Sequence, residues 1–326
     1  MFTLDELYAA EKIVRATLPP TPAISWPLIS SRLGATAIVK HENHNPTGAF
    51  KVRGGLTFVD ALKRRRPGAK GLISATCGNH GQSLAFAGAR AGLPVTIYVP
   101  RGNSTEKNTS MRALGADLVE FGDDFQQARE AAMNVAESLS LEPVPSFHVD
   151  LVRGVSTYAL ELLREHPDLD VLYVSVGQGS GICGCIAARE ALALKTEIVG
   201  VQAEGAPAYA LSFAAGHVVN TNAAETLADG VATRAPDAEA LAVILKGATR
   251  VTLVSDDEIA EAVSVYWRDT HNLAEGAGAA PLAAALRERG RLRGKKVGVV
   301  LSGGNIDFDL FQTWIAARDP RSGQPT

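Results

Sequence analysis

The chain has 326 residues, of which 46% are hydrophobic and 21% charged, a composition typical of a globular protein with one large or two moderate domains. Its net charge of −3 provides no basic field for nucleic acid or an anionic membrane, and no apolar run is long enough to span a bilayer. The N-terminus lacks the pattern of a signal peptide, and three cysteines form no even disulfide framework. We therefore expect a cytoplasmic protein that binds neither nucleic acid nor membranes.

Short apolar runs alternate with amphipathic segments along the chain. Most of these runs are continuously apolar, as in strands that are covered by helices on both faces. The predicted strands are residues 37–41, 71–75, 94–100, 117–121, 171–176, 197–202 and 296–301. Helices are predicted at residues 50–64, 79–91, 125–139, 151–165 and from about 180 to 194. This alternation predicts an α/β fold with mostly parallel sheets flanked by helices, and residues 142–146 are predicted to connect two clusters of such units.

The first candidate site lies in residues 41–55, with the sequence HENHNPTGAFKVRGG. In open α/β sheets ligands bind at the carboxyl ends of strands, and this segment follows one. Lys51 opens a predicted helix, whose positive terminus would lower the pKa of the lysine amine. A lysine with a lowered pKa is suited to form a Schiff base with a cofactor. A solvated lysine beside a turn is the simpler interpretation.

The second candidate lies in residues 74–82, with the sequence SATCGNHGQ. Small residues follow the predicted strand, and Asn79 and His80 open the next helix. Free backbone amides at a helix start are suited to hold a carboxylate of a substrate. The alternative is that Asn79 simply caps the helix.

The third candidate lies in residues 174–184, with the sequence VSVGQGSGICG. Its glycines would let backbone amides approach a phosphate at the helix start. Gly179, Gly181 and Gly184 also have the G-x-G-x-x-G spacing of a dinucleotide site, with Glu204 following about 20 residues later. An NAD-type dehydrogenase is therefore an alternative. It would place the motif unusually late in the chain and leave Lys51 unexplained.

The fourth candidate lies in residues 299–305, with the sequence VVLSGGN. Ser302 stands at the end of a predicted strand, where its hydroxyl could bond a ring nitrogen. A serine in a tight turn is the alternative, so this segment is informative only together with the other three.

In this order and spacing, the four segments resemble the threonine/serine dehydratase branch of the fold-type II pyridoxal-phosphate enzymes, the tryptophan synthase β-like family. Further similar segments are residues 21–22, 114–117, 227–230 and 275–280. The resemblance implies a larger cofactor-binding domain of residues 1–45 and 148–326, a smaller mobile domain of residues 46–147, and a homodimer. It implies no C-terminal regulatory domain, because little sequence follows Asn305.

The resemblance also implies roles for individual residues. Lys51 would hold pyridoxal 5'-phosphate and, once freed, take the α-proton of the substrate, with Phe50 packed against the cofactor ring. Asn79 would bond the 3-hydroxyl of the cofactor, and Ser302 would face the pyridine nitrogen without protonating it. The phosphate would bind a cup formed by Gly177, Gln178, Gly179, Ser180 and Gly181. The substrate carboxylate would bind the loop formed by Thr76, Cys77, Gly78, Asn79 and His80.

The sequence departs from this family pattern at several positions. Gln178 and Ser180 replace two glycines of the usual phosphate cup, which changes the surroundings of the phosphate. Cys77 stands where racemases of the family carry a catalytic serine, so we expect elimination to dominate over racemization. Gln202 and Ala208 occupy the places of acidic metal ligands, so we expect no required metal ion.

The expected activity is conversion of a β-hydroxy-α-amino acid of the threonine or serine type to a 2-oxo acid and ammonia. Residues 154–157 are less polar than in the family, so a phenylserine dehydratase is the nearest alternative. A 3-hydroxyaspartate dehydratase is less expected, because no new arginine is evident. A catalytically silent relative is the alternative from a different class.

Overall fold

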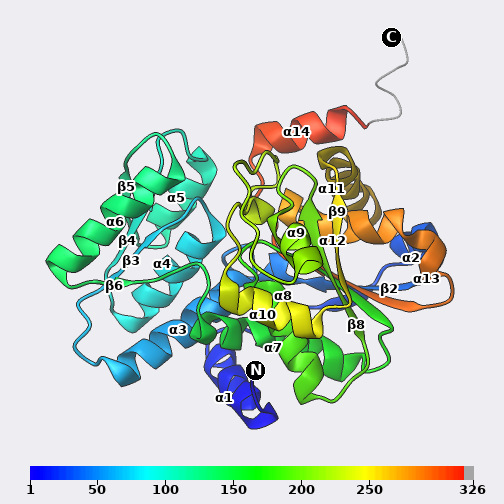
Figure 1. The fold of residues 1–326 in the computed structure, drawn as a ribbon, viewed down its shortest axis with the longest axis horizontal. Helices are drawn as coiled ribbons and strands as arrows, with labels where there is room; N and C mark the ends of the chain where they lie inside the picture. Colours follow the sequence, from blue (N-terminus) through cyan, green and yellow to red (C-terminus); the bar gives the residue numbers. More distant parts are fainter. Residues whose placement is uncertain (319–326) are drawn as a thin grey trace.

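The computed structural model describes residues 1–318, which form two β-sheets (Figure 1). The larger sheet has six strands. In spatial order they are β1 (Ala23–Ser25), β2 (Thr36–His41), β10 (Lys296–Leu301), β7 (Val171–Ser175), β8 (Glu197–Ala203) and β9 (Arg250–Val254). All neighbouring strands are parallel except the edge pair β1 and β2.

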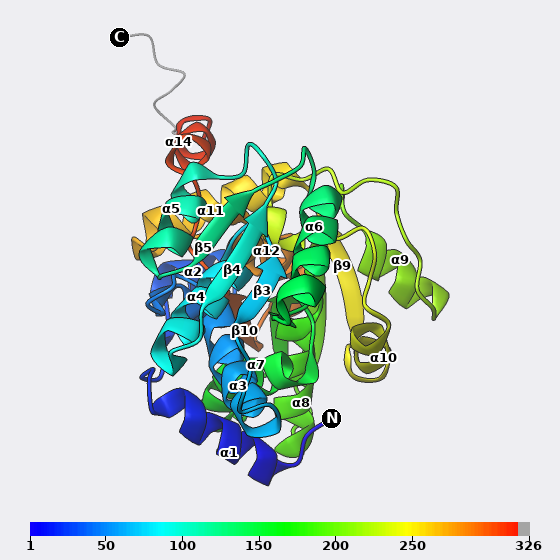
Figure 2. The same cartoon turned by 90° about the vertical axis from the view of Figure 1, so that its left-hand side faces the viewer.

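The smaller sheet has four parallel strands, and Figure 2 views the molecule from its side. In spatial order they are β5 (Asp117–Glu120), β4 (Val95–Val99), β3 (Leu72–Ala75) and β6 (Glu142–Pro143). All four lie within residues 46–147, the span proposed for a mobile domain, and that division stays a prediction. The predicted fold class, two mostly parallel sheets flanked by helices, is confirmed.

Helices cover both faces of each sheet. On the smaller sheet, α3 (Lys51–Arg65), α4 (Asn79–Ala91) and α5 (Thr105–Ala113) share one core, and α6 (Phe125–Leu139) covers the other face. On the larger sheet, α2 (Pro27–Leu33), α11 (Asp256–Thr270) and α12 (Gly276–Arg287) cover one face. The other face carries α1 (Leu4–Arg15), α7 (Val149–Glu165), α8 (Ser180–Ala191) and α10 (Ala238–Gly247). The remaining helices are α9 (Ala208–Ala215), α13 (Arg289–Leu292), α14 (Phe308–Ala316) and the 3₁₀ turns η1 (Glu42–His44) and η2 (Asp229–Val231).

Successive side chains of the central strands enter opposite cores. Tyr173 and Val299 belong to the core beneath α11 and α12, whereas Leu172 and Val300 belong to the core beneath α7 and α8. Because side chains alternate along a strand and both faces are covered, these strands need apolar residues at every position. This explains the continuous apolar runs in the sequence.

The seven predicted strands are present with ends that agree within one residue, whereas β1, β6 and β9 were not predicted. All three are edge strands. An edge strand has one neighbour and is often short or half-exposed, so its sequence signal is weak. The predicted connector of residues 142–146 contains the short strand β6, which pairs with β3.

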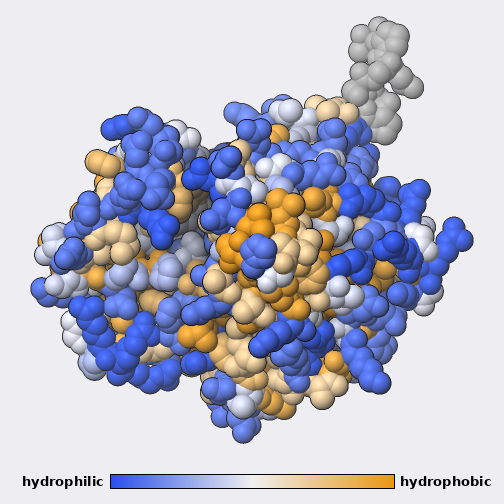
Figure 3. Space-filling view, in the orientation of Figure 1, coloured by the Kyte–Doolittle hydropathy of each residue, from blue (hydrophilic) through white to orange (hydrophobic). Residues whose placement is uncertain are grey.

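The face shown in Figure 3 is polar at its rim and apolar in the middle, over α9. Leu211 of α9 and Val218, which follows the end of this helix, are exposed apolar side chains. Among residues 1–318, no helix combines the length and the apolar character needed to cross a bilayer.

Candidate active site

The candidate segments meet at the carboxyl ends of the parallel strands. The segment before Lys51 is tied to the end of β10, since the Phe50 amide donates to the Ser302 carbonyl at 3.0 Å and Ala49 pairs with Gly303. The start of α4 is tied to the same place, because Asn305 donates to the side-chain oxygen of Asn79 at 2.7 Å. Topology thus brings together segments that lie up to about 250 residues apart, as expected for ligand sites in open α/β folds.

Lys51 is the first residue of α3, and its Nζ lies 5.2 Å from the centroid of the Phe50 ring. The Phe50 ring packs edge-on against Tyr158, with centroids 5.8 Å apart. Burial lowers the pKa of Lys51 to about 8, and the Glu275 carboxylate opposes this shift. The lowered pKa predicted from the sequence is therefore present, but burial is its main cause.

Asn79 begins α4 but does not cap it. The N-cap residue is Gly78, and no side chain bonds the first turn. Asn79 Nδ2 instead donates to Glu275 Oε1 at 2.6 Å, while Asn79 Oδ1 accepts from Asn305. The interpretation of Asn79 as a simple helix cap is wrong.

The loop of residues 76–80 is packed against a cation. A Cβ atom on Gly78 would lie 2.9 Å from Cδ of Lys107, and Lys107 Nζ pairs with Asp229 at 2.5 Å. Burial raises the pKa of Cys77 to about 11, Asp229 adds to the rise and Lys107 opposes it. The Cys77 thiol therefore stays protonated near neutral pH.

Thr76 and His80 are buried at the two ends of this loop. Burial lowers the pKa of His80 to about 3, and nearby Lys51 lowers it further, so its ring is neutral. Its Nε2 atom has no hydrogen-bond partner within residues 1–318. A buried neutral imidazole beside Lys51 adds no positive charge that would compete with the lysine.

The predicted phosphate cup is the uncapped start of α8. Gly179 is the N-cap, with a φ of 97°, and no side chain bonds the first turn of the helix. A Cβ at Gly177 would lie 2.2 Å from the Gly230 carbonyl oxygen, and one at Gly179 would lie 2.7 Å from Ala240. The backbone therefore requires glycine at positions 177 and 179. At positions 178 and 180, where the family usually has glycine, this chain has Gln178 and Ser180. The carbonyl of Gln178 accepts a bond from Tyr209 at 3.0 Å, and Ser180 is buried.

Gly181 and Ser302 complete the set of predicted cofactor residues. A Cβ at Gly181 would lie 3.6 Å from the Phe50 ring, so the phosphate cup and the Lys51 segment are adjacent. Ser302 is buried at the end of β10, and its hydroxyl lies 3.5 Å from that of Ser175. The residues fit pyridoxal 5'-phosphate, because amides at an uncapped helix start suit a phosphate and a partly buried lysine of lowered pKa lies nearby.

Four residues of the site were not predicted as site residues. Glu275 is buried at the start of α12, where burial raises its pKa to about 7 against the opposing effect of Lys107. Asn305 links Asn79 to the Thr47 carbonyl. Glu275 and Asn305 lie in segments that the sequence singled out, so a signal existed for both. Lys107 and Asp229 form an ion pair between α5 and η2 that only the tertiary structure reveals.

The glycine spacing that suggested a dinucleotide site is explained by packing between two helices. A Cβ at Gly184 would lie 3.1 Å from the Ser156 backbone nitrogen, so this glycine allows α8 and α7 to approach closely. Glu204 is exposed at the end of β8, and its carboxylate is 3.9 Å from Arg287. The G-x-G-x-x-G spacing is therefore used for helix packing as well as for the helix start.

Gln202 is fully buried where a metal ligand was considered. Its Nε2 donates to the Val176 carbonyl at 3.4 Å, and its Oε1 accepts from the Ala210 amide at 3.0 Å. The amide thus joins the strand before the phosphate cup to α9. In the described part of the chain, no three His, Cys, Asp or Glu residues are grouped to hold a metal ion.

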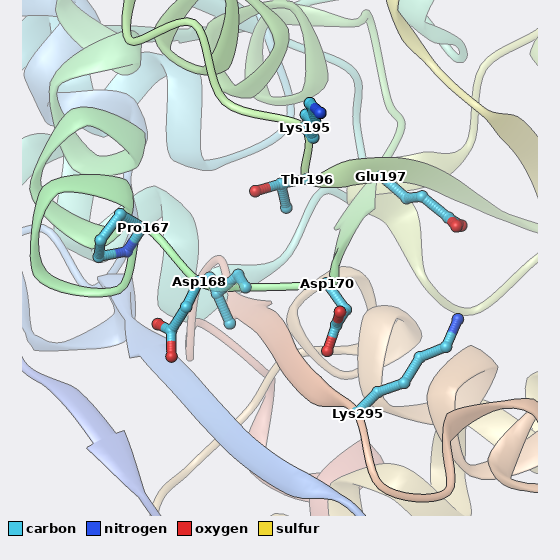
Figure 4. Close-up of a pocket in the computed structure, with 8 residues that line it drawn as sticks. Pro167, Asp168, Asp170, Lys195, Thr196, Glu197 and Lys295 are labelled. Atoms are coloured by element: carbon cyan, nitrogen blue, oxygen red, sulfur yellow. The ribbon is translucent and has the colours of Figure 1, made fainter.

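A hollow lies at the other end of the strands from the candidate site, at the amino ends of β7, β8 and β10 (Figure 4). Its labelled side chains are Pro167, Asp168, Asp170, Lys195, Thr196, Glu197 and Lys295. None of the predicted site residues lines it. Asp168 and Asp170 are both bonded to Lys296, so these carboxylates stabilise the start of β10.

A family model described as pyridoxal-phosphate dependent enzyme matches residues 14–303. The chain belongs to this family. It is 37% identical over 300 residues to an L-threonine ammonia-lyase of Geobacter sulfurreducens, covering 91% of this chain and 74% of that protein. It is 29% identical to an L-threo-3-hydroxyaspartate ammonia-lyase of Saccharomyces cerevisiae, covering 97% of both.

Among solved structures, the processed form of threonine deaminase isoform 2 from Solanum lycopersicum is similar, with a TM-score of 0.88 and 29% identity. The alignment covers 96% of this chain and 93% of that one. The predicted cofactor, pyridoxal phosphate, and the predicted threonine/serine dehydratase branch are confirmed. The dehydrogenase alternative is thereby excluded.

Proposed function

We propose that this protein removes water and then ammonia from a β-hydroxy-α-amino acid to give a 2-oxo acid. The observation that carries this proposal is Lys51, partly buried and with a lowered pKa, at the carboxyl ends of the strands where the four segments meet. Relatives named L-threonine ammonia-lyase and L-threo-3-hydroxyaspartate ammonia-lyase support it. Bound pyridoxal 5'-phosphate supplies an electron sink for the charge that develops at the substrate Cα.

Each residue of the proposed site has a separate role in this reaction. Lys51 would hold the cofactor and, as a free amine, would take the proton from Cα of the substrate. The Cβ–O bond would break and the hydroxyl would leave as water, with a proton that balances the one taken from Cα. The released enamine would tautomerise to the imine, which takes up one water and loses ammonia. Ser302 gives the pyridine nitrogen an uncharged partner, which favours loss of the β-hydroxyl over transamination. The amides of residues 177–181 hold the phosphate, and the loop of residues 76–80 holds the substrate carboxylate.

An uncharged β-substituent, as in threonine or serine, fits the surroundings of the loop best. Lys107 provides a cation beside Gly78, which could favour the acidic substituent of 3-hydroxyaspartate. However, Asp229 already pairs with this cation at 2.5 Å, so the pair carries no net charge. A second carboxylate on the substrate would compete with Asp229 for Lys107.

The test is an assay of 2-oxo acid and ammonia release from threonine, serine, phenylserine and 3-hydroxyaspartate. We expect kcat/KM for threonine or serine to exceed that for 3-hydroxyaspartate by roughly tenfold, the equivalent of one unfavourable charge contact. Release that is fastest from 3-hydroxyaspartate would contradict the proposed substrate class. Cofactor binding without turnover of any of the four would identify a catalytically silent relative.

Elimination is expected to dominate over racemization, because Cys77 places a thiol where racemases of the family carry a catalytic serine hydroxyl. A two-base racemase needs a second acid–base group, whose help is worth roughly 10²–10⁴-fold in rate. Burial raises the pKa of the Cys77 thiol to about 11, so little thiolate is present near neutral pH to act as a second base. We expect Cys77→Ser to raise inversion of one substrate stereoisomer, followed by chiral chromatography, with dehydration largely kept. Inversion as fast as 2-oxo acid formation in the unaltered enzyme would show that Cys77 is a catalytic acid.

No divalent cation is expected to be required for turnover. The Gln202 amide already makes two hydrogen bonds, to Val176 and Ala210, and carries no charge to attract a cation. Exhaustive chelation should therefore leave the rate of 2-oxo acid formation unchanged. A loss of most activity that added magnesium or calcium restores would contradict this expectation.

The mobile domain of residues 46–147 and the homodimer are proposed on the resemblance to the family, and the cytoplasmic location on the N-terminal sequence and the cysteine pattern. Contacts across the proposed domain boundary are consistent with closure over a ligand. Ser104 donates to Asp307 at 2.5 Å, and Glu106 accepts from the Phe308 amide at 3.0 Å.

A further inference from the structure

Three side chains and one backbone carbonyl form a continuous hydrogen-bonded chain beside Lys51. Asn305 Nδ2 donates to the Thr47 carbonyl at 2.8 Å and to Asn79 Oδ1 at 2.7 Å. Asn79 Nδ2 donates to Glu275 Oε1 at 2.6 Å. The chain therefore joins the loop before α3, the end of β10, and the starts of α4 and α12.

The direction of every bond in this chain is determined by its two ends. A backbone carbonyl can only accept, so Asn305 must turn its NH₂ group toward Thr47. Both N–H bonds of Asn305 are then used, and the second one requires the oxygen of Asn79 to face it. The NH₂ group of Asn79 consequently faces Glu275, whose ionised carboxylate can only accept. One N–H of Asn79 is left for a ligand, and its oxygen is turned toward Asn305.

The backbone leaves room for this chain only because glycine stands at two positions. Gly48 has a φ of 67°, and a Cβ there would lie 2.4 Å from Asn305 Oδ1. A Cβ at Gly303 would lie 2.2 Å from Glu275 Oε1. Both polar groups are therefore held against the main chain, and neither can rotate freely.

Glu275 remains an acceptor toward Asn79 in both of its protonation states. Burial raises the pKa of Glu275 to about 7, and Asp229 adds to the rise, whereas Lys107 and Lys51 oppose it. When ionised, it accepts a charge-assisted bond from Asn79; when protonated, it still has a carbonyl oxygen that can accept. Asn79 therefore has an acceptor on the Glu275 side on both sides of neutral pH.

We propose that Glu275 and Asn305 are positioning residues, which hold the Asn79 amide so that it offers an N–H and no oxygen to the bound ligand. This inference rests on the proposed function, in which Asn79 bonds the 3-oxygen of pyridoxal 5'-phosphate. A donor held in this way favours the ionised form of that oxygen. It also disfavours any ligand that presents a donor at the same place.

The test compares Asn305→Asp, Glu275→Met and Glu275→Gln in the full-length protein. Asn305→Asp keeps the shape but replaces the donor that faces Asn79 by an acceptor. Glu275→Met removes the acceptor, whereas Glu275→Gln keeps an acceptor oxygen and removes only the charge. Asn134→Asp is the matched control, because it makes the same chemical change at an exposed position on α6. The readouts are the pyridoxal 5'-phosphate dissociation constant, the pH midpoint of the cofactor's visible absorption, and the melting temperature of the apoprotein.

We expect Asn305→Asp and Glu275→Met to weaken cofactor binding by roughly tenfold or more, as for loss of one hydrogen bond to a charged oxygen. They should also raise the pH midpoint of the absorption, because the ionised 3-oxygen loses its donor. Glu275→Gln should weaken binding by less than about threefold, and Asn134→Asp should match the unaltered protein. If Asn305→Asp does not fold, the comparison of Glu275→Met with Glu275→Gln tests the inference by itself.

Two results would overturn the inference without touching the proposed function. One is cofactor binding and a pH midpoint that do not change in Asn305→Asp and Glu275→Met. The other is a lowered melting temperature with an unchanged midpoint, which would indicate a purely structural role. An unaltered protein that binds no pyridoxal 5'-phosphate would instead refute the proposed function, and this inference with it.

Discussion

Lys51→Met is expected to abolish turnover, by at least about 10³-fold, because one side chain both holds the cofactor and serves as the base. Borohydride treatment of the unaltered protein should fix pyridoxyl mass on the peptide that contains Lys51, and on no peptide of the variant. Lys63→Met is the control, because Lys63 is an exposed lysine on the same helix. A label on another lysine, or a colourless protein that takes up no cofactor, would contradict the assignment.

Lys51→Met is also expected to stabilise the apoprotein. Burial lowers the pKa of Lys51 from an ordinary 10.5 to about 8, so the folded state binds its proton more weakly than the unfolded state. The unfolded chain holds more protons between these values, so the free energy of unfolding of the unaltered apoprotein rises with pH there. Lys51→Met should therefore be more stable by about 1–3 kcal/mol at pH 7, with the advantage vanishing above about pH 10.5. Denaturant unfolding at several pH values measures it.

Arg53→Met is expected to lower the free energy of unfolding by about 3–5 kcal/mol, because it leaves buried carboxylates without their partner. The Arg53 side chain is completely buried, and its guanidinium bonds Glu42 at 2.8 Å and Glu161 at 2.5 Å. Lys40 and Arg15 also pair with Glu161, at 2.6 and 2.9 Å, so Glu161 keeps two cations while Glu42 loses its own. Arg53 lies two residues after Lys51 on α3, so its loss should also weaken cofactor binding.

Arg64→Met is the matched control for this loss of charge on α3. Arg64 is mostly exposed and pairs with Asp60 at 2.6 Å, one helical turn away. Exposed pairs of this kind contribute about 0–1 kcal/mol, so the two variants should differ several-fold in urea-induced unfolding. A loss below about 1 kcal/mol for Arg53→Met would mean that water or a rearrangement compensates the buried carboxylates.

Local sequence patterns were sufficient for the strands that lie in the middle of the sheets, whereas α11 and α12, which cover one face of the larger sheet, were not predicted. The central strands are buried on both faces, so each is a continuous apolar run that is bounded by turn residues. The segments after β2, β3, β7 and β10 stood out for the same reason, since ligands in such folds bind where strands end. The spacing of these segments was enough to indicate the family, which the comparisons show.

The tertiary structure alone decided how the site residues act on one another. The sequence predicted that the helix terminus would lower the pKa of Lys51. Burial is the main cause of the lowered pKa, and burial depends on the packing of both sheets. Asn79 appeared as a possible cap, yet its partners Glu275 and Asn305 lie 196 and 226 residues away. The pairing of Lys107 with Asp229 spans 122 residues and leaves no local pattern. Hydrogen bonds and ion pairs between distant segments are determined by topology, which no single stretch of sequence encodes.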